Sequence, residues 1–131
     1  MTKNRVLRQS TVFLFGAFVY GSFEILWRGY THPTMLLLGG ACFSMIYFFE
    51  RDTFLSERRI FKHFMYALII TFAEFVFGLF LNILLGLDIW DYSDLPLNIL
   101  GQICVPFYFL WVLLSIISSA VCKAMRFVFG E

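Results

Sequence analysis

Two glutamates interrupt long apolar stretches of the chain, where an ionised side chain needs a chemical reason to be present. Inside a bilayer such a group costs about 2.5–3.5 kcal/mol, so it usually faces the interior of a helix bundle. Glu24 is followed four residues later by Arg28, on the same face of a helix. Two interpretations stay open for this pair: an ion pair that anchors the helix end, or part of an ion or ligand site.

Glu74 has no basic residue within four positions on either side. It shares one helical face with Thr71, Gly78 and Asn82, and this polar face is expected to turn inward. Counting from Lys62 at about 1.5 Å per residue places Glu74 about 18 Å deep, near the bilayer midplane. The carboxyl is then either a protonated group that hydrogen-bonds across helices or a relay for protons or cations.

The segment 88–94 reads Asp-Ile-Trp-Asp-Tyr-Ser-Asp and combines three acidic residues with two large aromatic ones. Its negative field favours cations, and its aromatic rings suit the headgroup region. The alternative is a solvated turn in which Ser93 or Asp94 caps the next helix. The predicted polar site, whether for transport, for a ligand or structural, comprises Glu24, Arg28, Glu74, Asn82, Trp90, Asp91, Tyr92, Asn98 and Gln102.

Catalysis, metal binding and nucleic-acid binding are not indicated. The sequence has two histidines, no Ser-His or Cys-His pattern and no metal-spaced cluster. Its three cysteines lie in apolar segments, as small buried side chains do. The net charge is +1, and no GxxxxGK[ST] nucleotide loop is present. We therefore expect no enzyme activity, no cofactor, no metal and no nucleotide bound by this chain itself.

The elements that must position these residues are membrane-spanning helices. Apolar residues make up 60% of the 131 residues and charged residues 15%, whereas soluble domains carry about 25% charged residues. Four continuous apolar blocks, at 10–27, 34–49, 64–87 and 97–121, are close to the length needed to span a bilayer. We predict an all-α polytopic membrane protein, an antiparallel four-helix bundle of two hairpins in a single domain over residues 1–131.

Nine of the ten lysines and arginines fall on one side of this topology, in the N-terminal tail, the connection 51–62 and the C-terminal tail. The positive-inside rule then places both termini in the cytoplasm. His63, beside Lys62, is expected to be solvated at that interface, and the polar residues within the spans map to the outer half.

The two predicted hairpins share a sequence pattern. Pro33 and Pro96 precede the second and fourth blocks, where proline suits the first turn of a helix. A Leu-Gly-x-x-Cys stretch follows each proline, at 38–42 and at 100–104. Each first helix also holds one glutamate, which indicates a possible internal duplication.

The segment 88–104 followed by Trp111 resembles the signature of the bacterial CmpB-like family labelled ABC-transporter type IV. The vertebrate transmembrane protein 229 family has a similar stretch. Glu74 to Gly78 fits the third helix of the CmpB-like family, and the segment 24–40 is similar to its short four-helix branch. The resemblance implies a transport-related component of the bacterial cytoplasmic (inner/plasma) membrane.

Together these patterns predict a transport or channel-like component for ions, protons or small solutes, in contact with the lipid bilayer. Four helices rarely enclose a pathway alone, so we expect a homo-oligomer or a partner membrane protein. Any ATP-driven role would need a separate partner. The alternatives are a structural or regulatory protein that binds a partner or lipid headgroup through the segment 90–93, and a holin-like pore former.

Overall fold

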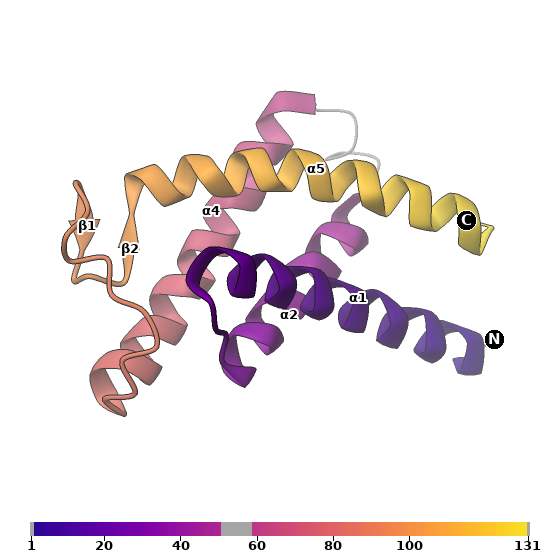
Figure 1. Cartoon of the computed structure of the whole chain (residues 1–131). Helices are drawn as coiled ribbons and strands as arrows, with labels where there is room; N and C mark the ends of the chain where they lie inside the picture. Colours follow the sequence, from indigo (N-terminus) through magenta and orange to yellow (C-terminus); the bar gives the residue numbers. More distant parts are fainter. Residues whose placement is uncertain (1, 51–58, 131) are drawn as a thin grey trace. The chain divides into compact units, whose positions relative to one another are not determined.

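The computed structural model describes residues 2–50 and 59–130. Its elements in chain order are α1 (Thr2–Arg28), α2 (Pro33–Glu50), α4 (Arg59–Gly78), the π-helix η1 (Leu79–Leu84), β1 (Asn98–Ile99), β2 (Ile103–Cys104) and α5 (Val105–Phe129) (Figure 1). Four long apolar helices pack as two hairpins, α1 with α2 and α4 with α5. The predicted fold class is confirmed, with one small strand pair added.

Most large apolar side chains on these helices point away from the protein. Leu26 is 83% exposed, Ile60 74% and Phe127 85%. Such a surface is stable only if lipid covers it, because contiguous apolar patches of this extent are rare on soluble monomers. The stretches Arg5–Arg28, Pro33–Glu50, Ile60–Leu84 and Val105–Phe129 are long and apolar enough to cross a membrane. The chain is therefore an integral membrane protein.

The chain forms two compact units, which we describe separately. One unit holds α1, α2 and the part of α5 from Ser118 onward. The other holds α4, η1, both strands and α5 as far as Ile117.

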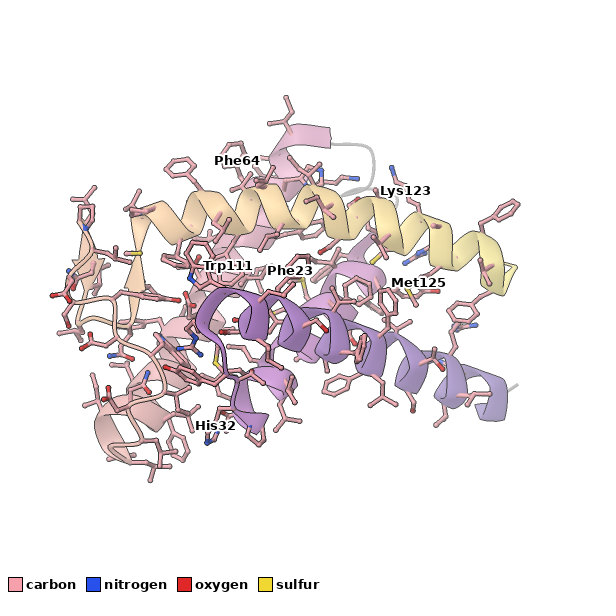
Figure 2. All side chains as sticks on the ribbon, viewed as in Figure 1. Phe23, His32, Phe64, Trp111, Lys123 and Met125 are labelled. Atoms are coloured by element: carbon pink, nitrogen blue, oxygen red, sulfur yellow. The ribbon has the colours of Figure 1, made fainter. Side chains whose placement is uncertain are left out.

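The turn between α1 and α2 follows the predicted design. Gly29 takes a positive φ of 83°, which stops α1, and Pro33 is the first residue of α2. His32 lies in this turn (Figure 2) and caps α2. Its Nδ1 accepts a hydrogen bond from the Thr34 N–H at 3.2 Å, and its carbonyl accepts one from the Met35 N–H at 2.9 Å.

Glycines let α1 and α2 approach closely. A Cβ added to Gly40 would lie 2.9 Å from the Phe13 carbonyl oxygen on α1, and one on Gly16 would meet the Phe43 side chain on α2. In lipid, where apolar burial drives association only weakly, such backbone contact is a main source of helix affinity.

The third helix begins earlier and ends differently from the predicted range 64–87. It starts at Arg59, so Lys62 and His63 belong to α4 and are only 2% and 9% exposed. The expectation that His63 is solvated was wrong, since its Nδ1 lies 3.2 Å from the Ser115 hydroxyl. After Gly78 the helix widens into η1 and ends at Leu84. The remaining predicted loop residues, 51–58, lie outside the described residues.

The fourth helix begins eight residues later than predicted. Residues 98–104 form an antiparallel pair in which Asn98 faces Cys104 and Ile99 faces Ile103 (Figure 1). A helix over 97–121 would have had Pro106 in its interior, where proline clashes with the preceding turn. In the structure Pro106 stands in the first turn of α5 instead.

The two Leu-Gly-x-x-Cys stretches have different structures. The first is part of α2, whereas the second is the β1–β2 turn, with Leu100 at φ 54° and Gly101 at φ 72°. This sequence match therefore gives no structural support for an internal duplication.

Candidate functional site

Residues 88–104, which we call the cap, fold back onto the end of α4. Gly78 marks the contact: a Cβ there would lie 2.5 Å from Gln102 Oε1 and 3.1 Å from Trp90 Cζ2. Only glycine leaves room for both side chains. Gly78 stands six residues before the end of η1, so the cap reaches back along the whole of η1 to the last residue of α4.

The π-helix positions Asn82 as the anchor of the cap. A π turn holds more residues than an α turn, so it redirects the side chains within it, and such turns are frequent at functional sites. The Asn82 Nδ2 donates to Gln102 Oε1 at 2.7 Å, and its Oδ1 accepts the Ile89 N–H at 2.7 Å. One side chain thereby holds both ends of the cap.

Two residues from the predicted site are buried inside the cap. Trp90 and Gln102 are each 5% exposed. The Trp90 Nε1 donates to the Gln102 carbonyl at 2.9 Å, and the Gln102 Nε2 donates to the Leu100 carbonyl at 3.0 Å. A partner that approached the segment 90–93 would therefore meet Asp91 and Ser93, which are exposed, rather than the Trp90 ring.

Asp91 and Asn98 shape the turns of the cap. The Ser93 hydroxyl and the Ser93 N–H, the latter at 2.9 Å, both donate to Asp91 Oδ1. These bonds hold the pKa of Asp91 below its usual value, the hydroxyl contributing most. The Asn98 Nδ2 donates to the Leu95 carbonyl at 2.8 Å, and its Oδ1 accepts the Gly101 N–H at 3.1 Å.

The cap reaches the buried carboxyl of Glu74 through Tyr92. Glu74 is 1% exposed. The Tyr92 hydroxyl donates to Glu74 Oε2 at 2.9 Å, and the Trp111 Nε1 lies 3.4 Å from Oε1. Trp111 lies on α5 (Figure 2), so three segments of this unit meet at one carboxyl. The Tyr92 ring stacks on Phe107, with centroids 4.6 Å apart and planes at 13°, which fixes its direction.

These two partners are compatible with both protonation states of Glu74. The indole N–H of Trp111 can only donate, so Oε1 acts as an acceptor. A tyrosine hydroxyl can donate or accept. The Tyr92 hydroxyl can therefore donate a hydrogen bond to Oε2 of an ionised Glu74. It can also accept a hydrogen bond from a protonated Glu74 after its own hydrogen rotates away.

Glu24 and Arg28 belong to the other unit and form an ion pair at the end of α1. The Arg28 Nε lies 2.7 Å from Glu24 Oε2, and the Tyr20 hydroxyl donates to Oε1 at 2.9 Å. The Arg28 guanidinium also stands 4.7 Å from the Tyr30 ring centroid. The predicted pairing is present, and both interpretations of it stay predictions.

Several buried polar residues were missed by the sequence reasoning, which expected polar groups mainly in the outer half. Glu50, at the end of α2, is 7% exposed and accepts a hydrogen bond from the Ser119 hydroxyl. Lys62 and the His63–Ser115 pair are buried in the other unit. The one available signal was the spacing of Ser115, Ser119 and Arg126 on a single face of α5. Among the described residues no cluster of His, Cys, Asp and Glu is arranged to hold a metal ion.

Comparison with known proteins identifies the family of this chain. No curated protein and no solved structure matches this chain. The sequence model of one family, described as Putative ABC-transporter type IV (CmpB), matches residues 3–129. That match includes all four helices and the whole cap. The chain therefore belongs to the CmpB family of Putative ABC-transporter type IV membrane proteins.

Proposed function

We propose that this protein is a proton-exchanging component of a membrane transport system, with Glu74 as the group that takes up and releases the proton. The observation that supports this proposal is the surroundings of Glu74. Its carboxyl is 1% exposed at a depth near the middle of its span, and Tyr92 can hydrogen-bond either protonation state.

In this proposal the cap acts as the gate. Tyr92 connects the cap to the carboxyl, so release of the cap from Gly78 and Asn82 would withdraw the hydroxyl and admit water to Glu74. Lids of this kind commonly open on the microsecond to millisecond timescale. The charge distribution predicts that the cap faces the outside, which makes it the outer gate.

The transport system requires further subunits. The family description refers to ABC transporters, and this chain has no nucleotide loop, so an ATP-driven role would rest on a separate ATPase. A second copy or a partner membrane protein would complete a pathway that four helices alone rarely enclose.

The experiment compares proton flux into proteoliposomes that contain wild-type protein or the Glu74→Gln variant, with a pH-sensitive dye inside. We expect flux with the wild type and its loss in Glu74→Gln, because an amide cannot exchange a proton in this pH range. Asp94→Asn is the matched control, since Asp94 is an exposed carboxyl of the cap. Size-exclusion profiles and helix content must match among the three proteins.

A second pair of variants tests the gate. Tyr92→Phe removes the hydroxyl that contacts Glu74 but keeps the ring stacked on Phe107, so we expect faster proton leak. Tyr108→Phe is the control, because the Tyr108 hydroxyl donates to the Phe64 carbonyl and is remote from the cap contacts. Equal flux in wild type and Glu74→Gln, or no flux in the wild type across pH and voltage, would overturn the proposal.

A second candidate is a regulatory membrane protein that binds a partner through the cap. The β1–β2 hairpin supports it, because Leu97, Ile99 and Leu100 are 73%, 54% and 65% exposed. This candidate predicts that Glu74→Gln leaves function intact, whereas Ile99→Asp abolishes partner capture. The flux experiment therefore separates the two candidates.

A further inference from the structure

A partly open cavity of about 540 Å³ lies between α1 and α2, at the ends of these helices that the charge distribution places in the cytoplasm. Most of its wall is apolar, with Val12 and Phe13 from α1 facing Met45 and Phe48 from α2. This cavity, which we call the α1–α2 groove, belongs entirely to one unit and is separate from Glu74 and the cap.

One arginine lines an end of the α1–α2 groove, and a second arginine packs against a tyrosine of the groove wall. Arg8 lines it, and so does Tyr47. The Arg126 guanidinium lies 4.5 Å from the Tyr47 ring centroid and donates to the Tyr47 carbonyl. The Nε of Arg126 is buried and has no hydrogen-bond partner within the described part of the chain. Arg8 therefore brings a positive charge to the wall of the groove, and Arg126 adds a second positive charge behind Tyr47.

The pairing of an apolar trough with arginines at the level of the cytoplasmic headgroups matches one kind of ligand. An anionic glycerophospholipid has an acyl chain for the apolar wall and a phosphate for the guanidinium groups. Basic pockets between membrane helices on the cytoplasmic side bind such headgroups, and the anionic lipids are concentrated in that leaflet.

We propose that the α1–α2 groove is a binding site for one anionic phospholipid of the cytoplasmic leaflet, with its phosphate on Arg8, beside Tyr47 and the charge of Arg126 behind it, and an acyl chain along Val12, Phe13 and Met45. This site is independent of the proposed proton exchange, and either can be present without the other.

The test measures lipid retention by native mass spectrometry of the full chain, released from micelles that contain equal amounts of phosphatidylglycerol and phosphatidylcholine. We expect one phosphatidylglycerol bound to the wild type and about fivefold lower occupancy in Arg8→Gln, the loss typical of one basic residue at a membrane surface. Arg5→Gln is the matched control, because Arg5 is exposed on the same helix and does not line the groove.

A second pair of variants tests the acyl-chain part. Ala41→Phe fills the groove and should remove the bound lipid, whereas Leu37→Phe, one turn away and 59% exposed, should retain it. Both positions face outward, so the fold tolerates either ring. The proposal is overturned by equal loss in Arg8→Gln and Arg5→Gln, by retention in Ala41→Phe, by equal binding of the two lipids, or by displacement of the lipid with inorganic phosphate.

Discussion

Replacement of Asn82 by leucine should detach the cap from α4 while leaving the four helices intact. Leucine has the same branched arrangement of side-chain heavy atoms as asparagine but can neither donate to Gln102 Oε1 nor accept the Ile89 N–H, both now at 2.7 Å. A side-chain hydrogen bond in a membrane protein contributes about 0.6 kcal/mol on average, so the loss of these two bonds costs about 1.2 kcal/mol of cap stability. The Gln102 amide oxygen, buried and left without its donor, adds about 1–3 kcal/mol.

The expected loss in cap stability is therefore about 2–4 kcal/mol, a factor of about 30 or more in the closed-to-open ratio. The assay is titration with sodium dodecyl sulfate in mixed micelles, followed by tryptophan emission in a Trp27→Phe background, which leaves Trp90 and Trp111 as the emitting residues. Trp90 is 5% exposed in the closed cap, and its indole ring becomes exposed to water when the cap opens, so its emission shifts to the red. Trp27, at 82% exposure, would only add a constant background.

Ile83→Leu is the control, because Ile83 neighbours Asn82 in η1 and is 54% exposed. We expect it to unfold like the wild type. If Asn82→Leu opened at the wild-type midpoint, the two hydrogen bonds would not hold the cap, and the account of η1 as its anchor would be wrong.

Four further outcomes concern the cap. Gly101→Ala should weaken it by more than about 1 kcal/mol in the same titration, because φ is +72° and the new Cβ would lie 2.7 Å from Asp91 Oδ1 and from Ser93 Oγ. Leu100→Gly should stabilise it by about 0.5–1 kcal/mol, since leucine at φ 54° is strained. The lowered pKa of Asp91 stabilises the folded cap fully above the ordinary value of 3.8, and this stability is lost as pH falls through the lower folded value. Ser93→Ala removes the main cause of the lowered pKa, so it should reduce the change in melting temperature between about pH 2 and pH 5. Burial raises the pKa of Cys104 above 9.0, so alkylation of this thiol should be slow at neutral pH and accelerate when the cap opens.

The number and type of the main elements could be predicted because lipid contact requires nearly every residue of a span to be apolar. The helix ends could not be predicted in the same way. Lys62 and His63 extend α4 beyond its apolar block, since both are buried by the fold, and His63 meets Ser115 from 52 positions away. No local pattern records a pairing of that separation.

The start of α5 was available in the sequence and was missed. Pro106 lies inside the apolar block 97–121, and a proline there favours a helix that begins beside it. The prediction instead took Pro96 as the residue that precedes the fourth helix. The strand pair itself was harder to predict, because Leu97 and Leu100 adopt positive φ, which leucine rarely does.

The grouping of site residues was predicted better than their roles. Asn82 and Gln102 were both placed in the outer half of the bilayer, and the structure joins them by a hydrogen bond. Their polar groups, however, mostly satisfy one another within the cap. That outcome follows from the cost of unpaired backbone and side-chain groups near lipid, which sequence spacing alone does not express.

The contacts that close the cap also set an order of assembly. Glu74 and Tyr92 are 18 residues apart, Asn82 and Gln102 are 20, and Trp90 and Gln102 are 12. All of these partners precede Val105, and short loops close quickly and at low entropic cost. The segments that form α4 and the cap therefore leave the ribosome before α5, which then packs beside them and adds Phe107 and Trp111 to their contacts.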